Sequence, residues 1–132
     1  MENLQQITVE KIKTFMEKWF EHFDQLDENS FFLQYLSEDV KMKFPGNDLF
    51  TGHKGFSDWF TESKKNLLAS TKHHVSDIKI TEMPENHFAV NFKVRYVAEM
   101  RDQKIDMDVQ EDWKLAWDEI RDQPVISEYI VS

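Results

Sequence analysis

HFAVNFKVRYVAEMR at residues 87–101 and KIDMDVQEDWKLAWD at residues 104–118 decide the fold. Apolar and polar side chains alternate through both segments, which is typical of β-strands with one buried face. Arg101-Asp102-Gln103-Lys104 suits a two-residue hairpin turn, which places Glu111 opposite Val94. One face of this hairpin is almost wholly apolar, so we expect it to face the interior. Its inward side chains are Phe88, Val90, Phe92, Val94, Tyr96, Ala98 and Met100 on the first strand and Ile105, Met107, Val109, Glu111, Trp113, Leu115 and Trp117 on the second.

A further strand is expected before this hairpin, from Thr71 to Met83. Pro84-Glu85-Asn86 fits a three-residue loop, because proline suits the first turn position and asparagine tolerates the left-handed conformation. The resulting register brings His74 beside Tyr96 on the inner face and turns His73 outward. A bulge near Thr71 would exchange the two histidines.

The rest of the chain is predicted from the spacing of its apolar residues. Three segments have the helical spacing, and the last segment alternates like a strand. We therefore expect an α+β fold in which three N-terminal helices pack on a strongly curved, mainly antiparallel sheet, as a single domain over residues 1–132. The expected elements are a helix whose apolar residues run from Ile7 to Leu26, with Thr8 as N-cap, a helix over Ser30–Ser37, an extended Lys41–Phe44, a turn at Pro45–Asp48, a helix over Gly52–Leu68 and a strand over Pro124–Val131.

The composition narrows the class of protein. The chain has 132 residues, with 16 Lys and Arg against 25 Asp and Glu, which gives a net charge of −9. This charge repels phosphate backbones and anionic membrane surfaces, so we expect neither nucleic acid nor a membrane as a partner. Met1–Gln6 lacks the basic-then-apolar order of a signal peptide, and no apolar run is long enough to span a bilayer. The protein is therefore expected to be soluble and cytoplasmic.

The sequence contains no motif that indicates a cofactor or a metal. Cysteine is absent, so there is no disulfide and no thiolate nucleophile. The 5 histidines lack the spacing that zinc sites use. No glycine-rich phosphate loop, Rossmann fingerprint or nucleophilic triad is present. We therefore predict neither a cofactor nor a metal, and a small molecule as the candidate ligand.

Glu111 is the only ionisable carboxylate among the inward positions of the two long strands. Burial disfavours the charged form of a carboxyl, so the pKa of an inward Glu111 should rise towards neutrality, as a general acid or base requires. His74 lies one strand beyond Tyr96, within reach of a ligand that also touches Glu111. The three residues are therefore candidate catalytic residues. The alternative is that a bulge turns Glu111 outward, or that it sits at a solvated rim.

Aromatic side chains are plentiful, with 11 Phe, 4 Trp and 3 Tyr. Those of the first and third helices are core residues first and pocket residues second. They favour a ligand that is planar or apolar with one or two polar groups. The residues expected to line the pocket are Trp19, Phe20, Phe23, Phe44, Trp59, Phe60, Phe92, Val94, Val109 and Trp113.

Three short motifs carry a resemblance to a known superfamily. They are Leu36-Ser37-Glu38-Asp39-Val40, Thr51-Gly52-His53-Lys54-Gly55-Phe56 and His73-His74-Val75-Ser76-Asp77-Ile78. With the order of the expected elements, they make the chain resemble the nuclear transport factor 2-like superfamily, which includes SnoaL-like cyclases and ketosteroid isomerases. The resemblance implies a cone whose concave sheet and helices enclose a pocket. It also implies a homodimer that forms through the sheet.

The isomerase chemistry of that superfamily does not carry over to this chain. In a rough alignment, Phe20 replaces the helix tyrosine, Phe44 the aspartate base before proline, and Trp113 the second acid. Dehydratase-like members use a histidine on the strand after the third helix. The best match for it is His73, whereas strand alternation favours His74, so both residues are kept as candidates.

Two functions are compatible with these residues. The first is a small-molecule-pocket protein of the SnoaL-like type, acting as a lyase or isomerase on a small apolar or aromatic ligand. In it Glu111 is the acid or base, His74 its partner and Tyr96 a hydrogen-bond donor. The second is a non-catalytic dimeric binding or association module whose pocket is filled by side chains. An inward polar group beside empty volume would favour the enzyme.

Overall fold

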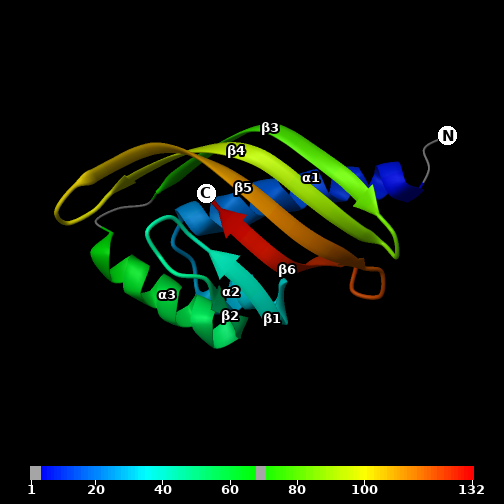
Figure 1. Cartoon of the computed structure of the whole chain (residues 1–132), viewed down its shortest axis with the longest axis horizontal. Coiled ribbons are helices and arrows are strands. Elements are labelled where there is room, and N and C mark those ends of the chain that lie inside the picture. Colours follow the sequence, from blue (N-terminus) through cyan, green and yellow to red (C-terminus); the bar gives the residue numbers. More distant parts are fainter. Residues whose placement is uncertain (1–3, 68–70) are drawn as a thin grey trace.

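The computed structural model describes residues 4–67 and 71–132 and is drawn in Figure 1. Among the expected positions, Leu68 and Met1 to Asn3 lie outside the described residues. The elements are α1 (Leu4–Asp24), α2 (Asn29–Leu33), β1 (Leu36–Lys43), β2 (Phe50–Thr51), α3 (Gly52–Asn66), β3 (Lys72–Met83), β4 (His87–Glu99), β5 (Lys104–Asp118) and β6 (Gln123–Val131).

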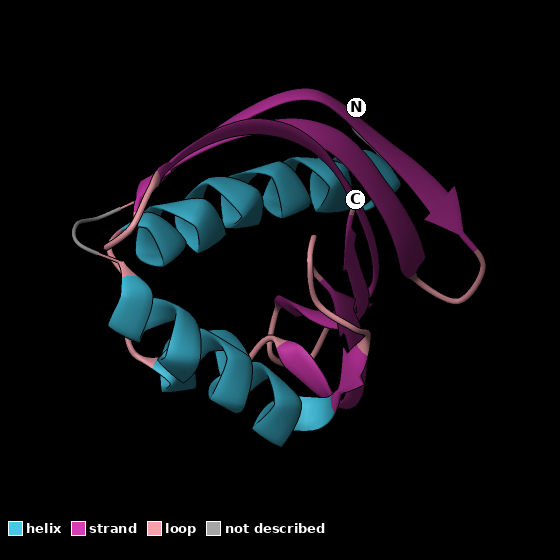
Figure 2. Ribbon diagram, turned by 60° about the vertical axis from the view of Figure 1, so that its left-hand side comes forward, coloured by secondary structure: helices cyan, strands magenta, loops and turns pink. Residues whose placement is uncertain are grey.

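The strands form one curved sheet in the order β2-β1-β6-β5-β4-β3. All neighbouring strands are antiparallel except β1 and β6, which are parallel. The long strands arch over α1, and α3 lies across the open side of the arch, as Figure 2 shows. The α+β prediction of helices packed on a curved sheet is therefore confirmed, although the parallel pair makes the sheet mixed. None of the described helices has the length and apolar character needed to cross a membrane.

The α1 helix packs its apolar side into the concave face of the sheet. It begins at Leu4, so Thr8 lies inside the helix and is not its N-cap as predicted. Its inward side chains are almost fully buried, as their helical spacing predicts. They are Ile12, Phe15, Met16, Trp19, Phe20 and Phe23.

The second helix is shorter than expected because a strand begins early. It ends at Leu33, and β1 starts at Leu36. The backbone N–H of Ile126 on β6 donates to the carbonyl of Tyr35 at 2.7 Å, and Leu36 pairs with Ile126. Sheet pairing with a distant strand therefore overrides the local helical pattern that extended to Ser37.

The β4–β5 hairpin is shifted by two residues from the predicted register. Glu111 lies opposite Phe92 and not Val94. The turn is moved by one residue along the chain, because the backbone N–H of Met100 donates to the carbonyl of Gln103 at 2.8 Å; Leu67, which follows α3, also pairs with Met100. A slip of two keeps every side chain on its predicted face, so Glu111 still points inward.

The β3–β4 pairing contains a bulge that is absent from the predicted register. The register is the predicted one at the loop, where Met83 lies opposite His87, but it shifts between Ser76 and Lys79. Consequently His73 lies opposite Tyr96 on the inner face, whereas His74 lies opposite Arg95 and is exposed. The prediction that His74 faces the pocket is wrong, because the extra residue reverses the faces of the strand beyond it.

The bulge depends on Asp77, which has a φ of 54°. Valine is strained in this left-handed region because of its branched Cβ, whereas glycine is not. We expect Asp77→Val to lower the free energy of unfolding by about 1–2 kcal/mol. We expect Asp77→Gly to keep the wild-type value within about 0.5 kcal/mol. Urea unfolding of both variants checks this, and a valine variant as stable as wild type would contradict the role of the bulge.

Candidate functional site

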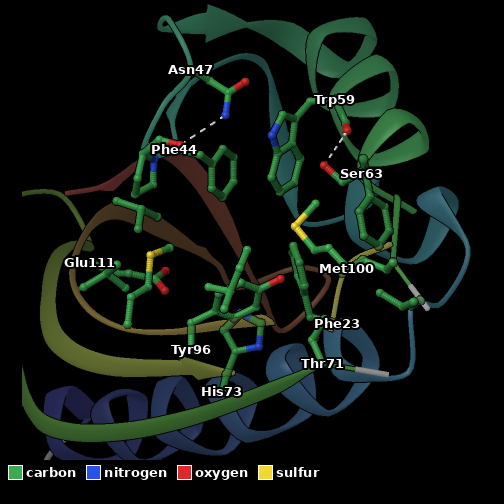
Figure 3. Close-up of a pocket in the computed structure, with 18 of the residues that line it drawn as sticks. Phe23, Phe44, Asn47, Trp59, Ser63, Thr71, His73, Tyr96, Met100 and Glu111 are labelled. Atoms are coloured by element: carbon green, nitrogen blue, oxygen red, sulfur yellow. Dashed lines mark hydrogen bonds between the residues drawn. The ribbon is translucent and has the colours of Figure 1, made fainter. Parts of the chain in front are cut away.

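A cavity of about 290 Å³ lies between the inner face of the sheet, α3 and the loop after β1. Figure 3 shows Glu111, Tyr96 and His73 on one side of it and Phe44 and Trp59 on the other. The cavity therefore has a polar wall, supplied by three neighbouring strands, and an aromatic wall.

Glu111 on β5 is the charged group of the polar wall. Only 2% of it is exposed, and this burial raises the pKa of its carboxyl from 4.5 to about 7. The indole Nε1–H of Trp113 donates to Glu111 Oε1 at 3.1 Å, and this bond opposes part of the rise. Near neutrality the carboxyl is therefore divided between its protonated and ionised forms, so it can give or take a proton.

Tyr129 on β6 is a second hydrogen-bond partner of Glu111. Its hydroxyl oxygen accepts a bond from Trp19 Nε1–H at 3.3 Å, so its own proton is available to the carboxyl. Burial and the charge of Glu111 raise the pKa of this phenol well above its ordinary value, so Tyr129 stays a donor. Tyr129 is not among the site residues predicted from the sequence. The only available signal was its place in the strand expected at Pro124–Val131.

His73 on β3 is held by Asp24 at the end of α1. Its Nδ1 lies 2.5 Å from Asp24 Oδ1, a bond in which the ring N–H donates to the carboxylate. The backbone N–H of His73 donates to Asp24 Oδ2 at 3.1 Å, and the Thr71 hydroxyl to Oδ1 at 2.9 Å. Since Asp24 engages Nδ1, Nε2 is the ring nitrogen available to a molecule in the cavity.

Tyr96 on β4 completes the polar wall beside His73. The two rings have centroids 4.8 Å apart, and the imidazole also contacts the ring of Phe20 at 4.9 Å. Burial and the charge of Asp24 raise the pKa of Tyr96 to about 12. The phenol therefore keeps its proton throughout the neutral range and can donate a hydrogen bond to a ligand.

The aromatic wall is rigid because its rings stack on one another. Phe44 and Trp59 are parallel within 7°, with centroids 3.8 Å apart. Asn47 and Ser63 also line this side of the cavity. Within the described part of the chain there is no group of three or more His, Cys, Asp or Glu that could hold a metal ion.

Half of the expected pocket residues line the cavity. These are Phe23, Phe44, Trp59, Phe60 and Val109. The others are buried in the core behind the wall, where their rings and side chains interlock, as in the contact of 5.1 Å between the Phe92 and Trp113 rings. They are Trp19, Phe20, Phe92, Val94 and Trp113.

The hydrogen bond from Trp113 gives a direct test of the polar wall. Because this bond favours the ionised carboxylate, we expect Trp113→Phe to raise the pKa of Glu111 above its value of about 7. A ¹³C NMR titration of the side-chain carboxyl, assigned with Glu111→Gln, measures the shift. Phe92→Leu is the matched control, because Phe92 packs against Trp113 without a bond to the carboxyl. A lower pKa in Trp113→Phe would contradict the geometry.

Comparison with known proteins identifies a shared fold. No family model matches the chain, and no curated protein matches it. A candidate dehydratase from the NTF2-like family of Streptomyces avermitilis superposes with a TM-score of 0.83 at 10% identity, over 97% of this chain and 96% of that one. A candidate scytalone dehydratase from Novosphingobium aromaticivorans gives 0.80 at 16% identity, over 96% and 84%. A Catenulispora acidiphila protein in complex with S-DNPA gives 0.78 at 11% identity, over 96% and 92%.

Proposed function

Since the chain has the nuclear transport factor 2-like fold, we propose that it is an enzyme of lyase or isomerase type that acts on a small apolar or aromatic molecule in the cavity. The observation that carries the proposal is that His73, Tyr96 and Glu111 all reach one cavity of about 290 Å³. Three proton-transfer groups around an empty volume are what such a reaction needs.

The reaction that suits these groups is proton abstraction next to a carbonyl. His73 takes the proton at Nε2, and Asp24 carries the charge opposite to that of the imidazolium that forms. Tyr96 donates a hydrogen bond to the carbonyl oxygen, where negative charge develops. Protonated Glu111 then gives its proton to a leaving hydroxyl, which departs as water in a lyase reaction, or to another carbon in an isomerase reaction.

The shape of the cavity supports a ligand of one or two rings. Its volume lies at the lower end of the range usual for small-molecule sites. The stacked pair of Phe44 and Trp59 provides a flat apolar surface opposite the polar groups. The solved complex of the structural neighbour with S-DNPA supports ligand binding by this fold.

The alternative function, a non-catalytic dimeric module, is less well supported. Its pocket would be filled by side chains, whereas this cavity has volume beside a buried carboxyl. The homodimer itself stays a prediction, and it is compatible with either function. Sedimentation of the purified protein would measure the assembly independently of activity.

Deuterium exchange tests the proposed chemistry without knowledge of the natural substrate. The protein is incubated in D₂O with 2-tetralone and with 3-hydroxy-1-indanone, and ¹H NMR follows α-proton exchange and loss of water. We expect α-proton exchange of both ketones, and loss of water from 3-hydroxy-1-indanone, to be faster in wild type than in buffer. We expect neither in Ser63→Trp, which places an indole in the cavity from α3. Rates equal to buffer for both ketones in the wild type would count against the proposal.

A further inference from the structure

We propose that Asp24 is a proton outlet that connects His73 with solvent through a groove outside the cavity. The inference rests on the proposed role of His73 as a base. It adds a second function to Asp24, which then carries the proton in addition to holding the ring.

The groove lies between α1 and β3, on the far side of His73 from the cavity. Its volume is about 450 Å³, and its apolar lining consists of Met16, Phe20, Val75 and Ile78. His73 lines both the groove and the cavity, whereas Asp24 lines only the groove. The side chain of His73 is 9% exposed and that of Asp24 is 25% exposed. The histidine is therefore a partition between the two spaces, and Asp24 is its contact with water.

The hydrogen bonds define the path of the proton. After His73 Nε2 takes a proton from the ligand, the imidazolium can release its other proton from Nδ1 to Asp24 Oδ1, 2.5 Å away. Asp24 then passes this proton to water in the groove. The imidazole is left neutral, with its remaining proton on Nε2, and no charge is stored. The same steps in reverse carry a proton from solvent through Asp24 to Nδ1 of His73.

In the proposed reaction the ligand occupies the cavity side of His73, so a proton that leaves the ring during the reaction needs a route on the other side. Nε2 is covered once a ligand is bound, and Glu111 is almost fully buried at the cavity wall. Without a second route, His73 could exchange its proton only with the ligand or after product release. Lys13, Glu17 and Glu21 surround the outer end of the groove, so water there meets a net negative rim, which favours departure of a proton.

The rate of exchange between water and the His73 ring proton tests the route without a substrate. It is measured by ¹⁵N-¹H NMR with water saturation on protein labelled with [¹⁵N]histidine. Glu17→Trp covers the groove from the exposed face of α1, and Ser63→Trp fills the cavity. We expect Glu17→Trp to slow exchange severalfold and Ser63→Trp to leave it unchanged. If Glu17→Trp does not fold, Ile78→Trp covers the groove from β3.

Asp24→Asn separates carrying a proton from holding the ring. Its side-chain oxygen can still accept the Nδ1–H bond, but an amide cannot take up the proton. We expect exchange to slow while the contacts of the ring with Phe20 and Tyr96 persist in the nuclear Overhauser spectrum. Exchange that is slowed by Ser63→Trp and not by a covered groove would overturn the proposal, whatever the deuterium assay gives. If exchange of the ring proton depends on the groove but neither ketone reacts, only the proposed function is rejected.

Discussion

The Glu111→Gln variant is expected to be more stable than wild type by about 2 kcal/mol near pH 8 and less stable by about 1 kcal/mol near pH 4. The pKa of Glu111 rises from 4.5 to about 7 on folding. Between these values the folded state keeps a proton that the unfolded state has lost, so the stability of wild type falls as the pH rises through this window. The shift corresponds to roughly 3 kcal/mol, and glutamine, which does not titrate, avoids that loss.

Part of the gain is lost because of the hydrogen bonds around the carboxyl. Trp113 donates to Glu111, and Tyr129 is bonded to it as well. Glutamine offers one acceptor oxygen to these two groups, which is why the net expectation is below the full shift. Urea unfolding at a series of pH values measures the difference, with the exposed Glu99→Gln as control. A difference that does not depend on pH would mean that Glu111 is solvated, and its role as acid would be withdrawn.

The inward position of Glu111 could be predicted because it depends only on parity. The strand pattern assigns each side chain to a face, and the hairpin slipped by two residues, which preserves that assignment. The spacing of apolar residues on α1 is equally local, since every inward residue follows from the helical period. Patterns of this kind survive errors in the exact register.

The partners of the site could not be predicted in the same way. The bulge at Asp77 exchanges His73 and His74, yet a single extra residue leaves the alternation of the sequence looking regular. Asp24 reaches His73 from the end of a helix, and Tyr129 reaches Glu111 from the last strand. These contacts depend on how distant elements pack together, which local periodicity does not encode.

The two ends of the polar wall are held in different ways, and this gives them different chemistry. Glu111 is enclosed by neutral donors, so burial decides its charge. His73 is oriented by the carboxylate of Asp24, which holds Nδ1–H and leaves Nε2 for the ligand. In the proposed reaction, a proton therefore passes from the ligand to His73 on one side of the cavity and from Glu111 to the ligand on the other. This asymmetry distinguishes an acid and base pair from two buried polar groups.

The largest loss of activity is expected from His73→Gln, which should slow the α-deuteration of 2-tetralone by about 10²–10⁴-fold. Glutamine fills similar space and can hydrogen-bond to Asp24, but it has no nitrogen that takes up a proton near neutral pH. Tyr96→Phe removes only a hydrogen-bond donor to the developing charge, so its loss should be smaller. The ratio of initial rates to wild type at equal protein concentration measures each effect.

His74→Gln is the matched control, because it makes the same change one residue away on the opposite face of β3. His74 lies opposite Arg95 and is exposed, so its replacement should leave the rate within about twofold of wild type. If His74→Gln were the slow variant and His73→Gln the active one, the base would sit on the outer face. The bulge would then be absent in solution, and the orientation of His73 by Asp24 would no longer explain catalysis. The pair of variants thus tests the strand register and the chemistry in one assay.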